Sequence, residues 1–217
     1  MKIEKSVRKA LEEFAKGDLE CAMLFTCISI DGTARKTYPH LRNDNRKRFT
    51  EFIKSNYDIL EEILFSGFKI DGFPQVFGAD FTRSRWLFKK SDSDKISQVV
   101  DFADIIYKVH RCCHAHGECL PEGFELIPNP NKKQYRLTFS VKPGSVQFSD
   151  HIIPALLAIT ILDPVNQDLI DSLLDQYRLP IKGQDYIVNE WWGKRDYVRS
   201  LLPEREKVAF DSIDLRD

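Results

Sequence analysis

The sequence predicts a mainly α-helical bundle that carries a small antiparallel β element at about residues 124–149. Apolar residues recur at intervals of three and four along most of the chain, which is the pattern of amphipathic helices. Between residues 121 and 149 this pattern changes to short alternating runs separated by Pro and Gly turns, which indicates strands. The composition is 42% hydrophobic and 30% charged, as in globular proteins that bury a core of their own.

The first part of the chain predicts three helical stretches. Residues 3–16 place their apolar side chains on one face, and Gly17-Asp18 ends this helix and caps the next one. Residues 19–37 begin with apolar side chains nearly all round, which predicts a central helix that is buried on several sides. Residues 45–65 predict further helix.

A long amphipathic helix is predicted from residue 91 to Gly117. Residues 91–94 (Ser-Asp-Ser-Asp) are a strong start signal, and Gly117 is a stop signal. The stretch at the end of this helix, residues 107–119, holds three of the five histidines and three of the five cysteines. Imidazole and guanidinium groups hold phosphates, move protons or bind metals, so this stretch is the candidate site.

The second part of the chain predicts strands and then helices. Short alternating runs predict strands at residues 124–127, 135–141 and 146–149. Helices are predicted at residues 150–163 and 164–177, and Pro at the first position opens the second of them.

The length of 217 residues fits one large domain. We expect residues 1–177 to form the helical domain, with the β insertion at about residues 121–149. Residues 178–217 are expected to form a C-terminal extension packed on the same domain, with a strand at residues 185–192.

The net charge and the number of cysteines limit which partners and which cellular compartment the sequence predicts. The net charge of −1 excludes general polyanion binding, so any RNA contact must come from a local basic patch. The N-terminus starts a charged amphipathic helix instead of an apolar signal segment, and no apolar stretch is long enough to span a membrane. Together with an odd number of cysteines, these features predict a cytoplasmic protein with free thiols and no membrane partner.

The helix end carries the motif Arg111-x4-His116, preceded by an aliphatic-aromatic run and followed by Gly117. This context resembles the HEPN superfamily of helical-bundle proteins, many of which are ribonucleases with an R-x4-6-H motif. A second feature, Asp31-x3-Arg35, is similar to the acidic residue that the family places four positions before a basic one. At this spacing the two side chains share a helix face and can pair.

The resemblance implies a metal-independent endoribonuclease that binds RNA, needs no cofactor and acts as a homodimer. Arg111 and His116 would be catalytic, with supporting residues Asp31, Arg35, Cys112, His114 and Glu118. The ribose 2′-OH would attack the adjacent phosphorus, while imidazole moves the protons and guanidinium stabilises the developing charge. Proteins of this kind often serve as toxins or in antiviral defence, which implies an antitoxin or regulatory partner.

The geometry of an ideal helix restricts this pair. Five residues correspond to about 140° of rotation, so Arg111 and His116 do not share a face. They can act together if Gly117 loosens the last turn, or if two copies meet across a dimer axis. His114, three residues after Arg111, shares its face better and is the alternative acid or base.

Two other interpretations remain open for this stretch. His110 and His114 could chelate zinc together with Cys113 or Cys119, although the spacing matches no strong zinc pattern. Alternatively, the cysteines and His110 pack in the core, and Arg111 pairs with an acidic neighbour such as Glu118 or Asp104. Cys112 stands where the HEPN family usually has a polar residue, and this favours a non-catalytic binding or dimerisation module.

A basic stretch follows the central helix. Its side chains would attract a phosphate backbone if this stretch lies beside the helix that carries Arg111. The candidate RNA-binding residues are Lys36, Arg42, Arg46, Lys47 and Arg48, with Arg35 beside them and only Asp44 opposing. The alternative is a solvated basic loop.

Overall fold

The computed structural model describes the chain at residues 2–64, 68–69, 101–129, 139–142, 145–181, 184–196, 198 and 206–207. The predicted helix start at residues 91–94 lies outside these ranges. So do residues 135–138 of a predicted strand.

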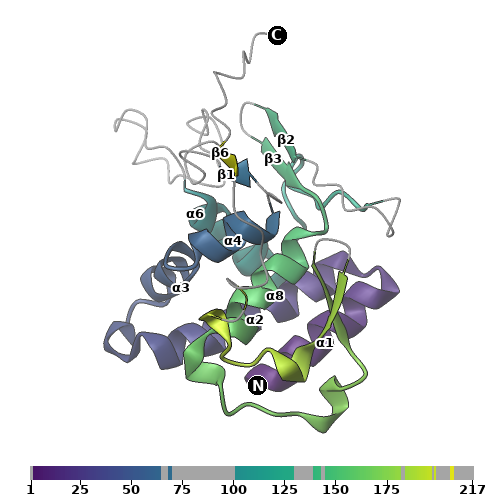
Figure 1. Ribbon diagram of the computed structural model, residues 1–217. Helices are drawn as coiled ribbons and strands as arrows, with labels where there is room; N and C mark the ends of the chain where they lie inside the picture. The colour runs from purple at the N-terminus through teal and green to yellow at the C-terminus, as the bar shows by residue number, and fades with distance from the viewer. Residues whose placement is uncertain are drawn as a thin grey trace.

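The described part is mainly helical, which confirms the predicted fold class (Figure 1). The α-helices are α1 (Ile3–Lys16), α2 (Leu19–Thr37), α3 (Asn45–Lys54), α4 (Tyr57–Leu64), α6 (Phe102–Ile105), α7 (Cys112–His116) and α8 (Ile152–Leu162). A π-helical segment, η4 (Ile106–Arg111), joins α6 to α7. The 3-10 turns are η1 (Pro39–Leu41), η5 (Pro164–Asn166), η6 (Ser172–Leu174) and η7 (Val188–Glu190).

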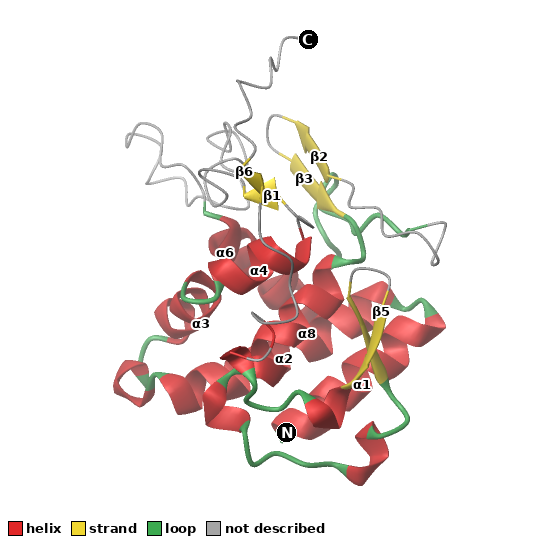
Figure 2. Ribbon diagram, viewed as in Figure 1, coloured by secondary structure: helices red, strands yellow, loops and turns green. Residues whose placement is uncertain are grey.

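The described strands form three two-stranded sheets at the periphery of the helices (Figure 2). The hairpin β2 (Phe139–Lys142) and β3 (Ser145–Phe148) is antiparallel, as predicted for the β element. The strands β4 (Arg178–Ile181) and β5 (Gln184–Ile187) form a second antiparallel hairpin, and β1 (Phe68–Lys69) pairs with β6 (Glu206–Lys207) in parallel. The strand predicted at residues 124–127 is reduced to one bridge, from Ile127 to Ser149.

The core is built around α2 and α8, which cross at the centre of the bundle (Figure 1). Every residue of α8 is buried, as expected for a helix that is apolar all round. The hydroxyl groups that α2 buries donate to carbonyl groups of its own preceding turn, as Thr26 does to Ala22 at 2.8 Å. The central, buried position predicted for residues 19–37 is therefore confirmed. Among the described helices, none combines the length and apolar character that crossing a membrane requires.

Two helix boundaries follow local signals. Gly17 ends α1 in the left-handed conformation, and the Asp18 carboxylate caps α2 by accepting a hydrogen bond from the N–H of Cys21. The helix predicted at residues 45–65 is instead divided into α3 and α4. Asn56 lies at the break, where its side chain donates to the carbonyl of Phe52.

The prediction of a helix at residues 164–177 is wrong, because this segment forms only the turns η5 and η6. The carboxylates of Asp163 and Asp171 each accept a hydrogen bond from the backbone N–H two residues later. Such local bonds compete with a helix. In addition, buried Asn166 donates to the hydroxyl of Thr33 and the carbonyl of Thr160. These contacts with α2 and α8 fix the segment in a non-helical course.

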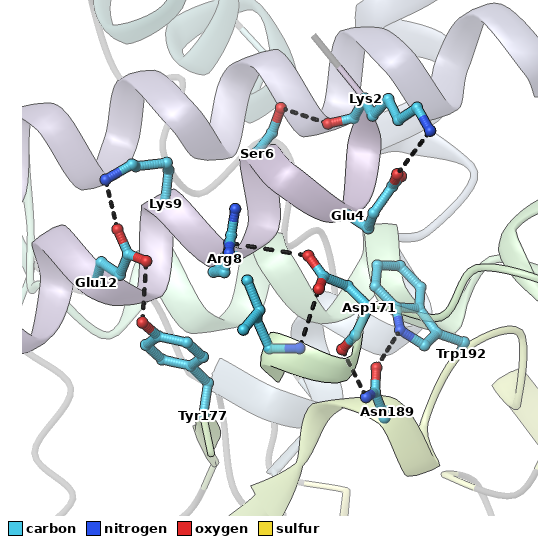
Figure 3. Close-up of polar contacts among 11 residues, drawn as sticks. Lys2, Glu4, Ser6, Arg8, Lys9, Glu12, Asp171, Tyr177, Asn189 and Trp192 are labelled. Carbon is cyan, nitrogen blue, oxygen red and sulfur yellow. Dashed lines mark hydrogen bonds and ion pairs between the residues drawn. The ribbon is translucent and has the colours of Figure 1, made fainter. Parts of the chain in front are cut away.

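The segment between α8 and β5 lies against α1 (Figure 3). The Tyr177 hydroxyl donates to the Glu12 carboxylate at 2.9 Å, and the Arg8 guanidinium lies 3.8 Å from the Asp171 carboxylate. The strand predicted at residues 185–192 is shorter than expected, because the chain turns into η7 after Ile187.

Gly193 is a position where we expect a large loss of stability on substitution. Its φ is +69°, and an added Cβ would lie 2.5 Å from Cβ and 2.6 Å from Cα of Gln167. Gly193→Ala is therefore expected to lower the free energy of unfolding by more than about 2 kcal/mol. The matched control is Gly17→Ala, which has a φ of +84° but open space around the new Cβ, and should cost only about 1 kcal/mol. Urea denaturation measures both, and equal losses would contradict the clash with Gln167.

Candidate functional site

The helix that carries Arg111 contains a wide turn that the sequence did not predict. In η4 the backbone N–H of Cys112 donates to the carbonyl of Tyr107, five residues earlier. One extra residue in a turn rotates all following side chains by about 100° relative to a continuous α-helix. Short π-helical segments of this kind are rare and occur frequently at functional sites.

The helix then continues regularly to His116. Gly117 follows in the left-handed conformation, with a φ of +67°. The N–H of Glu118 donates to the carbonyl of Cys113 at 2.9 Å, and that of Gly117 to the carbonyl of His114 at 3.3 Å. This pair of bonds is the Schellman motif that closes helix C-termini. The predicted stop at Gly117 is confirmed, and the last turn is not loosened.

Arg111 is paired with Asp31 across the contact between η4 and α2. Its Nε and Nη2 atoms donate to Oδ2 of Asp31 at 3.2 and 3.1 Å. The two side chains are 21% and 15% exposed. Partial burial opposes the charge of the guanidinium, but the attraction and hydrogen bonds of Asp31 outweigh it and raise the pKa of Arg111. Asp31 therefore pairs with Arg111, and no ion pair with exposed Arg35 is present among the described residues.

The aromatic ring of Tyr107 packs against the guanidinium of this pair. The guanidinium carbon of Arg111 lies 5.4 Å from the centre of the Tyr107 ring, in a cation–π contact. The sequence prediction did not include Tyr107 in the site, although its spacing of four residues before Arg111 is one at which helical side chains meet.

Two atoms of the pair have no hydrogen-bond partner among the described residues. Nη1 of Arg111 makes no hydrogen bond with the described residues and is not among the atoms shielded from solvent. Oδ1 of Asp31 is buried and has no hydrogen-bond partner in the described part of the chain. The guanidinium is thus fixed along one edge and free along the other.

The two candidate histidines differ in their surroundings. His116 is exposed, and no contact with Arg111 is present in the described structure. His114 is half-buried on the side of the helix that faces α2, where its Nε2 atom has no hydrogen-bond partner among the described residues. Burial lowers the pKa of His114, against the opposing charge of Glu20.

His110 is fully buried, and neither ring nitrogen has a partner among the described residues. Its ring centre lies 5.9 Å from that of His114 and 6.2 Å from that of Phe148. Burial, together with the charge of His114, lowers the pKa of His110 to about 3. Within the described residues, no group of three or more His, Cys, Asp or Glu side chains is placed to hold a metal ion.

The cysteines near Arg111 pack as small apolar residues. Cys27 on α2 is buried beside the pair, and burial, reinforced by the charge of Asp31, raises the pKa of its thiol. Burial also raises the pKa of Cys113, with exposed Glu118 adding to the effect. Cys112 is half-buried. Thiols with raised pKa are poor nucleophiles, so Cys27 and Cys113 are assigned to packing.

The basic stretch is divided by the fold. Arg42, Arg46 and Lys47 are exposed, and Arg46 is held by Asp104 at 2.7 Å. Lys36 is also exposed and lies 3.4 Å from the side-chain oxygen of Asn166.

The prediction that Arg48 belongs to the basic surface is wrong, because its side chain is buried. It donates to the carbonyls of Leu41 and Arg42 and to Oδ1 of Asn45. Arg48 thus closes the turn before α3, and its charge is not offered to a ligand.

Sequence comparison places the chain in a family. The family described as Rv1289 matches residues 2–215. The chain belongs to the Rv1289 family. The Mycobacterium tuberculosis protein Rv1289 (strain H37Rv) is 26% identical over 216 residues, which is 98% of this chain and 94% of that protein. The Mycobacterium bovis protein Mb1320 is similar to the same extent. No solved structure matches the chain. The names of these relatives state no activity.

Proposed function

We propose that this protein is a cytoplasmic, metal-independent endoribonuclease of the HEPN kind, acting as a toxin or defence protein. The observation that carries the proposal is the pairing of Arg111 with Asp31. The two sequence features that resemble the HEPN family lie 80 residues apart and meet at one ion pair, beside a π-helical turn.

In the proposed reaction the 2′-oxygen attacks phosphorus and the bond from phosphorus to the 5′-oxygen breaks. The products are a 2′,3′-cyclic phosphate and a 5′-OH. Nη1 of Arg111 hydrogen-bonds the phosphorane oxygen, where charge develops. An imidazole accepts the 2′-OH proton, and the 5′-oxygen takes up a proton from a solvent water as it leaves.

We assign the imidazole to His116 of a second copy in a homodimer. Within one chain the regular helix turns His116 by about 140° from Arg111, because it continues up to Gly117. His116 is exposed, so it can reach a ligand bound to another copy. His114 lies nearer to the side of Arg111, but its Nε2 atom is buried.

The direct test is cleavage of a labelled RNA in EDTA by the wild-type protein and by His116→Ala and His114→Ala. We expect His116→Ala to lower the rate by about 100-fold or more, the usual contribution of a general acid or base. His114→Ala should retain most of the rate. Undiminished cleavage by His116→Ala would exclude its role, and loss only in His114→Ala would transfer that role to His114.

Mixing two inactive variants tests the dimer. If Arg111 and His116 act across a two-fold axis, then Arg111→Ala and His116→Ala chains together form one intact site in each mixed dimer. After random re-association half of the dimers are mixed, and each of these has one intact site out of two. The mixture should therefore regain about a quarter of the wild-type rate. No recovery from a mixture shown to contain mixed dimers would place both residues in one chain.

The exposed basic residues are expected to bind the RNA backbone. Lys47→Gln removes one exposed charge from the first turn of α3. It should weaken binding of all RNA sequences similarly and reduce the slope of log affinity against log salt by about 0.7. Lys16→Gln, which removes an exposed charge at the end of α1, is the control. Equal slopes for wild type and Lys47→Gln would exclude Lys47 from the contact.

A second candidate is a non-catalytic RNA-binding or dimerisation module, which would also suit a regulatory or antitoxin partner. The observation that favours it is the compensation of the Arg111 charge by Asp31, together with Cys112 at the usual polar position. RNA binding without cleavage from about pH 5.5 to 8, the range in which unperturbed histidines titrate, would favour the module over the enzyme.

A further inference from the structure

Two arginines flanking Tyr107 are held in the same way. Arg111 donates from Nε and Nη2 to one oxygen of Asp31. Arg46 donates from Nε and Nη2 to one oxygen of Asp104, at 3.2 and 2.7 Å. In both cases Nη1 is free of hydrogen bonds to the described residues. The two acidic residues thus fix the orientation of two guanidinium groups, each with one edge left for an anionic ligand.

On its helix, Tyr107 lies between Asp104, which holds Arg46, and Arg111. It follows Asp104 by three residues and precedes Arg111 by four, the two spacings at which helical side chains are neighbours. Its ring is fixed by an edge contact with Phe49, at 5.4 Å between centres, and by the guanidinium of Arg111. The direction of the ring, and hence of its hydroxyl, is therefore set before any ligand arrives.

The hydroxyl of Tyr107 is unused in the described structure. No described residue hydrogen-bonds to it, and it is not among the buried polar atoms that lack a partner. Burial of part of the ring raises the pKa of Tyr107, although the charges of Arg111 and Arg46 oppose this. The group therefore remains a neutral O–H donor at physiological pH, flanked by two fixed cations.

We propose that the Tyr107 hydroxyl donates a hydrogen bond to the RNA phosphodiester that the free edges of Arg111 and Arg46 bind. The inference rests on the proposed function, since it names the ligand of the same site. A phosphodiester oxygen has the acceptor chemistry that two guanidinium edges and a phenol O–H require, and the phenol adds a donor without adding charge. Tyr107 is thus a binding residue that no sequence motif indicated.

The experiment compares Tyr107→Phe with the wild-type protein in binding a 2′-O-methyl oligoribonucleotide, which cannot be cleaved because its 2′-oxygen is blocked. The Phe ring keeps the contacts with Phe49 and Arg111, so the thermal midpoint should not change. We expect affinity to fall about 10-fold, the value of one hydrogen bond to a charged group. Tyr186→Phe, which removes a hydroxyl bonded to Gln184 in β5, is the matched control and should bind like wild type.

The salt dependence separates the hydroxyl from the charges. Tyr107→Phe should lower affinity without changing the slope of log affinity against log salt, because no charge is lost. Arg46→Gln should lower both the affinity and the slope, by about 0.7 for one phosphate contact of single-stranded RNA. A parallel change of slope in Tyr107→Phe would contradict direct hydrogen bonding by the hydroxyl.

The outcomes distinguish this inference from the proposed activity. Wild-type affinity in Tyr107→Phe overturns the inference, even if the protein cleaves RNA. If Tyr107→Phe binds more weakly but the wild-type protein does not cleave RNA, the inference is supported and the proposed nuclease activity is overturned. A wild-type protein that neither binds the oligonucleotide nor cleaves RNA overturns both.

Discussion

Replacing Arg111 with alanine is expected to lower the rate of RNA cleavage by about 100- to 1000-fold, the effect of removing one fixed donor to a developing oxyanion. Arg111→Lys should lose nearly as much, because an ammonium group cannot donate to Asp31 along one edge and to phosphate along the other. Initial rates on a fluorescent oligoribonucleotide in EDTA measure both variants.

The control for Arg111 is Arg178→Ala, which removes an exposed arginine that bonds only to nearby backbone carbonyls in the described structure. It should cleave at the wild-type rate. If Arg111→Ala cleaves as fast as Arg178→Ala, the guanidinium has no part in the reaction and the proposed mechanism fails.

The same substitution also has a cost in stability, which can be separated from the loss of rate. Without Arg111, the largely buried carboxylate of Asp31 has lost its partner, which costs about 1–3 kcal/mol. Arg46→Ala breaks a pair whose arginine is 53% exposed and should cost less than about 1 kcal/mol. Adding Asp31→Asn to Arg111→Ala should recover part of the stability and none of the rate.

Acid is expected to destabilise the protein through His110. Burial and the charge of His114 lower the pKa of His110 from 6.5 to about 3 in the folded state. As the pH falls below 6.5, the unfolded chain therefore binds a proton that the folded chain does not. The free energy of unfolding should fall by about 1.4 kcal/mol per pH unit from this group alone, until the folded state is also protonated near pH 3.

The variant His110→Leu isolates this contribution. It removes two buried nitrogens that have no partner in the described structure, so it should be at least as stable as wild type at pH 7.5. Between pH 6.5 and 4.5 it should lose about 2–3 kcal/mol less than the wild-type protein. Urea denaturation at several pH values gives both curves. The control His40→Leu, at an exposed position, should follow the wild-type curve, and parallel curves for His110→Leu would falsify the assignment.

The helices near the N-terminus could be predicted because their signals are local. The apolar period of residues 3–16 and the cap at Asp18 depend only on neighbours in sequence. The segment 164–177 could not be predicted in this way. Its turns depend on Asn166, which bonds to side chains and backbone of two other helices. A helical pattern cannot reveal a partner that lies more than 100 residues away.

In the candidate site, too, some features follow from local sequence and others depend on tertiary contacts. By itself, the sequence determined that Arg111 and His116 stand at a helix end before Gly117, and that Asp31 lies on a central helix. Only the tertiary structure decided that Asp31 pairs with Arg111, that Tyr107 supports the guanidinium, and that Arg48 is buried. For the ion pair the physical reason is that Asp31 and Arg111 stand 80 residues apart in sequence and meet only because α2 packs against η4.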